Sequence, residues 1–276
     1  MYRVVADTLS FLLHLHLMSS FTKRVSLFLF FCSFIIGAFF SAQQIQQYEA
    51  GQDYKNTLTF SNTQKWNPFF LASADAPFEI SPEQFETITL PLPYTNTSDD
   101  TKKDLTTLHN YTKLRTSEKI AEIKSELQLS DAYFGAETFD ELTNGKKRPN
   151  TSRLFDFIAE FEMPIIFYEK RKYNRVRPSY LDTTLSTVIE VPLHPSYPSG
   201  HATQSYLRAL ILSDLNPRDK NTYFLAAKRI STNREIAGLH YPSDSKAGEL
   251  LAQQLYILLL QNKDFSLILS QAKTEW

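Results

Sequence analysis

The chain has 276 residues, enough for one large domain or two small ones. Its hydrophobic content of 42% supports a real core, and its net charge of −1 gives no indication of a nucleic-acid partner. Only seven glycines are present, which argues against an all-β sandwich with many tight turns.

The N-terminal part carries a very apolar, uncharged segment, Val25–Ala42, preceded by Lys23 and Arg24 and followed by a glutamine-rich stretch. This layout is typical of a secretory signal peptide, so we expect residues 1–42 to be removed and the protein to be exported, periplasmic or secreted. An uncleaved anchor is the alternative, because the segment is just long enough to span a bilayer.

Met18 is a more natural start for such a signal peptide than Met1. One interpretation is therefore that translation begins at Met18 and that residues 1–17 are a spurious extension. The single cysteine, Cys32, lies inside the apolar segment. If that segment is removed, the mature chain has no disulfide.

Residues 43–97 are rich in proline, notably at Leu90–Pro93, and are expected to form an irregular lead-in with one short strand or helix. Ser98 can cap a helix that continues to Leu129. Apolar residues recur there at helical spacing, either in one helix or in two with a break around Arg115–Ser117.

Further along, apolar spacing predicts helices at about 151–168, 202–215, 218–233 and 245–260, the last helix we expect. The β-branched segment 181–191 favours an extended conformation. No internal repeat or low-complexity linker separates these elements, so residues 98–276 are predicted to form a single all-α domain.

The central motif is the turn Pro198–His201, which leads into an apolar helix. Proline stiffens the approach, serine is a good N-cap and glycine lets the backbone come close to a ligand. The turn therefore delivers Ser199, Gly200 and His201 to a helix N-terminus, a natural place to hold an anion.

Two basic clusters flank this turn: Lys170 with Arg177 before it, and Arg234 with His240 and Asp244 after it. Lysine and arginine with backbone amides are the usual means of holding a phosphate-like oxyanion. No set of carboxylates or thiolates typical of a metal site accompanies them, so we expect no metal.

In this order the motifs K-x6-R-P, P-S-G-H and R-x5-H-x3-D resemble the type 2 phosphatidic acid phosphatase superfamily, over roughly residues 90–262. That superfamily includes the bacterial class A non-specific acid phosphatases, to which the chain is most similar, and the vanadium-dependent haloperoxidases. One position departs from the pattern: Asn233 stands where the family has serine.

The resemblance implies a helical bundle of the acid phosphatase and haloperoxidase type, and a metal-independent phosphatase acting on small phosphate monoesters. His240 would be the nucleophile that forms a phosphohistidine, Asp244 would fix its tautomer, and His201 would be the general acid. The phosphoryl oxygens would be held by Lys170, Arg177, Ser199, Gly200 and Arg234.

Several alternatives stay open. A vanadium haloperoxidase would use the same residues to hold vanadate as its cofactor, and a membrane-tethered enzyme would act on lipid or pyrophosphate head groups. A non-catalytic anion-binding protein would not require His201, His240 and Asp244 together. Contact with a membrane is expected only if the N-terminal segment is retained. The resemblance also implies that the protein can form a homo-oligomer.

The neighbouring cations Arg171, Lys172 and Arg175 are interpreted as solvated charges or as supports of the site rather than as ligands.

Overall fold

The computed structural model describes residues 43–47, 49–127 and 148–276. The chain divides into two compact units, 1–54 and 55–276. In the first unit, the described residues 43–47 and 49–54 are helical. The predicted signal peptide lies outside the described residues. Among the helices that are described, none has the length and apolar character needed to cross a membrane.

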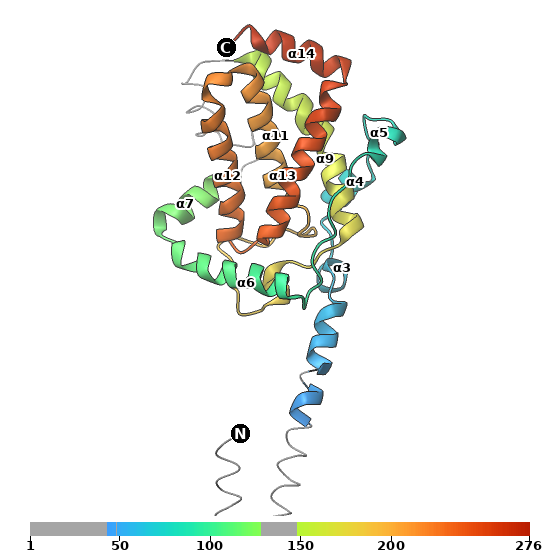
Figure 1. The fold of residues 1–276 in the computed structure, drawn as a ribbon, viewed down its shortest axis with the longest axis vertical. Helices are drawn as coiled ribbons and strands as arrows, with labels where there is room; N and C mark the ends of the chain where they lie inside the picture. The colour runs from blue at the N-terminus through green and yellow to red at the C-terminus, as the bar shows by residue number, and fades with distance from the viewer. Residues whose placement is uncertain (1–42, 48, 128–147) are drawn as a thin grey trace, which may run out of the picture. The chain divides into compact units, whose positions relative to one another are not determined.

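The described part of the second unit consists of helices and loops, without a β-strand, which confirms the all-α prediction (Figure 1). Its helices are α3 (Phe60–Thr63), α4 (Pro68–Asp75), α5 (Pro82–Glu86), α6 (Asp99–Tyr111), η1 (Thr112–Leu114), α7 (Ser117–Ser125), α9 (Pro149–Tyr173), α10 (Pro178–Leu181), α11 (Gly200–Leu215), η2 (Pro217–Asp219), α12 (Lys220–Ile236), α13 (Pro242–Leu260) and α14 (Lys263–Lys273).

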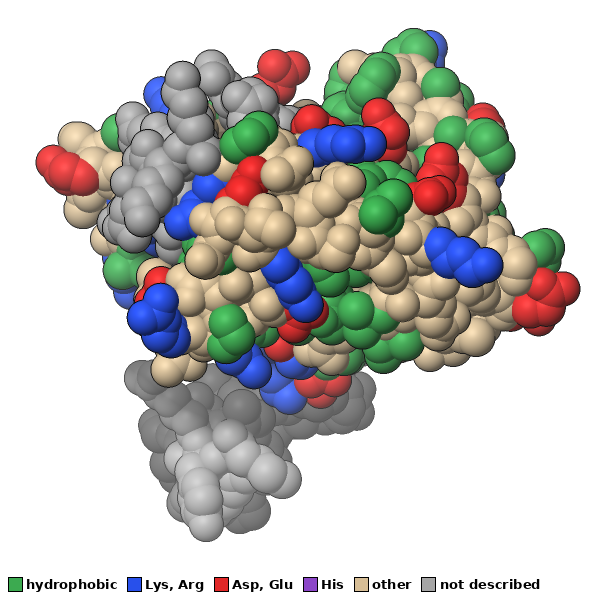
Figure 2. Space-filling model, turned by 90° about the horizontal axis from the view of Figure 1, so that it is seen from above, with side chains coloured by type: hydrophobic (Ala, Val, Ile, Leu, Met, Phe, Trp, Pro, Cys, Tyr) green, Lys and Arg blue, Asp and Glu red, His purple; other side chains and the backbone are tan. Residues whose placement is uncertain are grey.

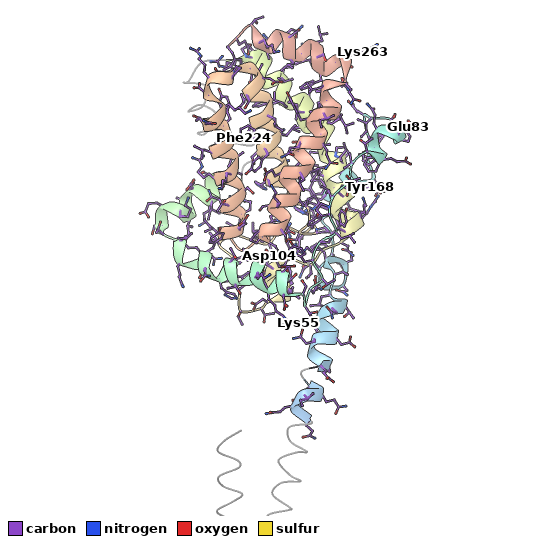
Figure 3. The ribbon with its side chains drawn as sticks, viewed as in Figure 1. Lys55, Glu83, Asp104, Tyr168, Phe224 and Lys263 are labelled. Atoms are coloured by element: carbon purple, nitrogen blue, oxygen red, sulfur yellow. The ribbon has the colours of Figure 1, made fainter. Side chains whose placement is uncertain are left out.

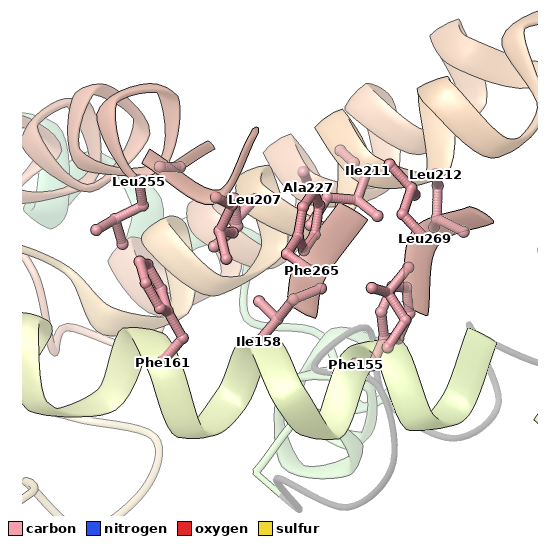
Figure 4. Packing of buried hydrophobic residues seen from close by; sticks show 14 of the residues in the cluster. Phe155, Ile158, Phe161, Leu207, Ile211, Leu212, Ala227, Leu255, Phe265 and Leu269 are labelled. Atoms are coloured by element: carbon pink, nitrogen blue, oxygen red, sulfur yellow. The ribbon is translucent and has the colours of Figure 1, made fainter. Parts of the chain in front are cut away.

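Helix α11 lies at the centre of the bundle and packs against both α12 and α13, while α9 packs against α14 and α4. The core between them is formed by side chains at helical spacing, such as Phe155, Ile158 and Phe161 of α9 (Figure 4). From the other helices, Leu207 and Phe265 complete this apolar layer.

One glycine sets the approach of α13 to the start of α11. A Cβ atom at Gly248 would lie 2.5 Å from the carbonyl oxygen of Ser199 and 2.8 Å from the Cβ of Ala202. Only glycine therefore permits this close packing. As a result, the first two turns of α13 lie beside the first turn of α11.

On the face drawn in Figure 2, basic and acidic side chains are interspersed rather than gathered into a patch of one sign. This matches the net charge of −1.

Several elements differ from the sequence prediction. The lead-in 43–97 is more helical than expected, because Pro68 and Pro82 occupy first-turn positions, where their missing N–H costs no hydrogen bond. Helix α9 continues past Pro164 to Tyr173. Helix α14 was not predicted, although it buries an amphipathic face that includes Phe265.

The structure also decides two other predictions, one for the helical region after Ser98 and one for the segment 181–191. Helices α6 and α7 are separate, which confirms the break predicted at Arg115–Ser117 as one of two alternatives. In the segment 181–191, Leu181 ends helix α10 and the remaining residues form turns and loop instead of a strand; the backbone N of Val188 donates a hydrogen bond to Ala237 O at 3.0 Å. Because no neighbouring strand is available among the described residues, the β-propensity of this segment is not realised.

Candidate active site

The predicted site residues come together from five places in the chain. Lys170 lies in the last turn of α9, Arg177 caps α10, and Ser199, Gly200 and His201 begin α11. Arg234 lies in the last turn of α12, His240 precedes α13 and Asp244 lies in its first turn.

His240 is buried between a carboxylate and a guanidinium. Its Nδ1 lies 3.3 Å from Asp244 Oδ2 and its Nε2 lies 3.1 Å from Arg177 Nη1. Since a guanidinium only donates, Nε2 accepts and Nδ1 carries the proton toward Asp244. Burial and the charge of Arg177 lower the pKa of His240 to about 3. The imidazole is thus neutral, with a lone pair on Nε2.

Asp244 is held from several sides. Arg175 Nη1 donates to Oδ1 at 2.6 Å, while Ser196 Oγ and the backbone N of Tyr241, at 3.0 Å, donate to Oδ2. Burial alone would raise the pKa of this carboxyl, but Arg175 and the bond with His240 hold it below its usual range. Asp244 therefore stays ionised and keeps the tautomer of His240 fixed.

Arg175 has a more specific place than its sequence context suggested. Its guanidinium is buried, lies 3.8 Å from the ring centre of Tyr241 and bridges Asp244 to Asp104, whose Oδ2 is 3.9 Å from Nη2. Asp104 lies on α6, below the N-terminal end of α13 (Figure 3). Arg175 is thus a support of the site and not a solvated charge.

Replacing Arg175 by methionine is expected to lower the free energy of unfolding by about 3–5 kcal/mol, because it leaves the buried Asp244 without its cation. Arg171→Met is the matched control: Arg171 pairs with Asp75 at the surface, where such a pair contributes about 0–1 kcal/mol. Urea denaturation of both variants measures the difference. Equal losses would contradict the role given to Arg175.

Lys170 is fully buried and ties down the central turn. Its Nζ donates to the carbonyl oxygens of Pro195 at 3.0 Å, Ser196 at 3.3 Å and Pro198 at 2.5 Å. Burial and the nearby Arg177 lower the pKa of its ammonium well below the ordinary value. An anion beside it would offset both effects.

Arg177 is oriented by His194, a residue that the sequence motifs did not single out. Its Nε donates to His194 O at 3.0 Å and its Nη2 donates to His194 Nδ1, also at 3.0 Å. Burial and the charges of Arg177 and Lys170 lower the pKa of His194 well below the ordinary value, so it is neutral. Burial also lowers the pKa of Arg177 to about 10, at which the guanidinium remains charged at neutral pH.

Arg234 is anchored on one side and open on the other. Its Nη2 donates to Glu126 Oε2 at 2.6 Å and to Ile123 O at 2.9 Å. Within the described residues, its buried Nε and Nη1 have no hydrogen-bond partner. Asn233, the departure from the family pattern, donates to the other oxygen of Glu126 at 2.7 Å. Glu126 was missed because nothing marks it among the other charged residues of its predicted helix.

His201 presents a second unpartnered group. Its Nε2 is buried and has no partner among the residues described. Burial, Arg234 and His240 lower the pKa of its imidazole well below the ordinary value. Beside it, Ser199 caps α11 by accepting a hydrogen bond from Ala202 N, and its own backbone N donates to Asp244 O at 3.0 Å.

Five of the predicted site residues line one cavity of about 210 Å³: Lys170, Gly200, His201, Arg234 and His240, together with the polar residues His194 and Gln204. Arg177, Ser199 and Asp244 lie behind this lining and hold its residues in place. Two buried cations, one of which (Arg234) has unpartnered N–H groups, lie at the N-terminus of a long helix and suit a tetrahedral anion. In the part of the chain that is described, no group of three or more His, Cys, Asp or Glu residues is arranged to hold a metal ion.

The chain is similar in sequence to two curated acid phosphatases. The chain is 33% identical over 111 residues to a non-specific acid phosphatase of Providencia stuartii, which covers 39% of this chain and 45% of the relative. It is 30% identical over 132 residues to an acid phosphatase of Zymomonas mobilis, which covers 46% and 50%. The chain thus spans about half the length of the curated relatives it matches.

Among solved structures, the fold is similar to that of a bacterial vanadium-dependent iodoperoxidase, with a TM-score of 0.55 and 14% identity, over 74% of this chain and 61% of the other. The family model of the PAP2 superfamily matches residues 158–265. All the predicted site residues fall within that range. Residues 158–265 therefore resemble the PAP2 superfamily over the part of the chain that carries the predicted site.

Proposed function

We propose that the chain is a metal-independent phosphatase that hydrolyses phosphate monoesters through a phosphohistidine on His240. The observation that carries this proposal is the neutral His240, placed between Asp244 and Arg177 at a cavity that also holds the unpartnered N–H groups of Arg234. The acid phosphatase relatives support the same activity.

In the first step, the Nε2 lone pair of His240 attacks phosphorus and the bond to the ester oxygen breaks. His201 donates its proton to the leaving alkoxide. In the second step, His201 takes a proton from water, which attacks the phosphohistidine and releases phosphate. The electron pair of the N–P bond returns to His240, and both residues regain their starting states.

Proton donation requires His201 to be protonated when substrate is bound. Its pKa in the free protein is lowered by burial and by the positive charge of Arg234. A phosphate dianion in the cavity neutralises that charge, so the pKa of His201 rises on binding. Lys170, Arg177 and Arg234, with the Ser199 hydroxyl and the Gly200 amide, then stabilise the equatorial oxygens in the transition state.

Hydrolysis of p-nitrophenyl phosphate by the full chain, from about pH 4 to about pH 9, tests this function. Activity that survives EDTA and is lost with micromolar vanadate supports it. Activity that depends on a metal would contradict the metal-free mechanism. If no hydrolysis occurs, oxidation of bromide by vanadate-loaded protein with peroxide would support the haloperoxidase alternative, and failure of both would leave anion binding alone.

The substrates are expected to be small phosphorylated molecules outside the cytoplasm. We infer export from the apolar N-terminal segment, which acts either as a signal peptide or as an anchor, with residues 98–276 as the catalytic domain. Sequencing the N-terminus of the cell-derived protein distinguishes cleavage near Ser41 or Ala42 from retention of the segment. Association of the protein with membranes would accompany retention only.

The acid limb of kcat/KM is expected to lie far below the ordinary histidine range. Protonation removes the nucleophilic lone pair, and the pKa of His240 is lowered to about 3. At pH 5, only about 1% of His240 is therefore protonated, whereas an ordinary histidine would be mostly charged. The measurement is kcat/KM against pH, corrected for substrate ionisation. Loss of activity below pH 6.5 that titrates as one group would contradict a neutral, buried nucleophile.

A further inference from the structure

The cavity has a second wall that the phosphoryl chemistry does not use. Opposite in character to the polar lining, it consists of apolar side chains, namely Phe70, Leu127, Met163, Ile166, Phe167, Pro192 and Leu239. Because this wall is continuous with the residues that hold the anion, whatever is esterified to the phosphoryl group must lie against it.

Three rings give this wall a fixed shape. Phe70 of α4 stacks on Phe167 of α9, with ring centres 4.9 Å apart and an angle of 16° between the rings. His194 meets both edge-on, at 4.8 Å from Phe70 and 5.1 Å from Phe167. Such contacts restrain aromatic side chains, and the exposed faces and edges of rings favour another ring as a neighbour.

Helix α4 is itself held in place beside the cavity. The backbone N of Asn67, which caps α4, donates to Leu193 O at 2.9 Å, next to His194. Helix α4 also packs along α9. Phe70 therefore belongs to a wall that is supported from both sides.

The volume limits what fits. A cavity of about 150 Å³ lined by apolar side chains accepts one benzene molecule, and a water molecule occupies about 30 Å³ in the liquid. A cavity of about 210 Å³ therefore has room for one six-membered ring beside the phosphoryl group.

Hydroxyl groups would be poorly satisfied at this wall. Gln204 is a polar residue among these apolar neighbours, and its Nε2 is directed to the sulfur of Met163 at 3.5 Å. The rest of the Gln204 amide can bond one or two hydroxyl groups, but a sugar placed against the rings would bury its other hydroxyl groups without partners and lose affinity.

We propose that the apolar wall selects phosphate monoesters of compact aromatic alcohols and phenols, of the size of a benzyl or phenyl ester, over sugar phosphates. This inference rests on the proposed function, since it places the phosphoryl group among the cations of the same cavity. Phe70 is the specificity-determining residue, because its ring forms the wall with Phe167 and His194 and takes no part in the phosphoryl chemistry.

Binding of non-hydrolysable phosphonates tests the wall without requiring turnover. Titration calorimetry of the full chain is expected to give a dissociation constant at least about tenfold lower for benzylphosphonate than for 2-hydroxyethylphosphonate. Equal affinities in the unmodified protein would overturn the proposal. Octylphosphonate binding much more tightly than benzylphosphonate would also overturn it, because the site would then suit a lipid chain.

Two phenylalanines on the same helix provide a matched pair of variants. Phe70→Ala is expected to abolish the preference for the benzyl group, whereas Phe69→Ala, whose side chain is 66% exposed, is expected to keep it. A preference that survives Phe70→Ala would contradict the role of Phe70. If Phe70→Ala does not fold, Phe70→Leu, which removes the stacked ring but keeps an apolar side chain, is expected to weaken the preference.

Turnover separates this inference from the proposed function. Benzyl phosphate and glucose 6-phosphate are both esters of primary alcohols, so their leaving groups differ mainly in apolar character. The inference predicts a higher kcat/KM for benzyl phosphate by about tenfold or more. Equal hydrolysis of both would overturn the inference alone, while failure to hydrolyse either would overturn the proposed function and leave the phosphonate titration to decide on the wall.

Discussion

Replacing His240 by alanine is expected to lower kcat for p-nitrophenyl phosphate by at least about 10⁴-fold, because the variant has no group that can form the covalent intermediate. The fold is expected to survive, since the neutral ring is held by hydrogen bonds at the edge of a cavity and not by the apolar core. Far-ultraviolet circular dichroism and thermal unfolding check the fold alongside the kinetics.

The chain offers a matched control for this variant. His109 forms a second histidine–aspartate pair, with Nε2 2.8 Å from Asp182 Oδ2, on α6 and away from the cavity lining. His109→Ala is expected to leave kcat within a few-fold of the unmodified protein. Turnover retained by His240→Ala, or lost equally in both variants, would contradict the assignment of His240 as nucleophile.

Replacing Arg234 by lysine is expected to lower kcat/KM by about 10²–10³-fold, the usual cost of removing one preorganised donor to a developing negative charge. The lysine keeps the positive charge and can reach Glu126, but it lacks the fork whose Nε and Nη1 remain available for a ligand. Inhibition by inorganic phosphate is expected to weaken in the same variant.

Arg229→Lys is the control on the same helix. Arg229 pairs with Glu122 through Nε at 3.1 Å, and its side chain is partly exposed. Its replacement is expected to leave kcat/KM nearly unchanged. If Arg234→Lys behaves like Arg229→Lys, the open side of Arg234 has no part in holding the phosphoryl group.

The three motifs predicted which residues would lie close together, because the polar residues within each motif are only a few positions apart and lie at the ends of helices. Lys170 and Arg177 flank the end of one helix, and Ser199 to His201 begin another. Most helices were also predictable, since their apolar residues recur at helical spacing. Helix α14 was missed, although its buried residues follow the same spacing.

The supports of the site could not be predicted, because they join residues far apart in the chain. Arg175 reaches Asp244 across 69 positions, and Glu126 reaches Arg234 across 108. In the sequence, each is one charged residue among many on a polar helix face or in a basic run. The aromatic wall could not be predicted either. Phe70 lies in a segment that was expected to be irregular, and it meets Phe167 only because α4 packs on α9.

The most direct test of the phosphohistidine is to trap it. The protein is mixed with radiolabelled p-nitrophenyl phosphate, quenched within milliseconds in alkali, under which phosphohistidine survives, and digested for peptide mapping. We predict label on the peptide that contains His240, with none in His240→Ala. Rapid turnover without any labelled peptide would contradict the covalent mechanism, and label on His201 instead would reverse the roles of the two histidines.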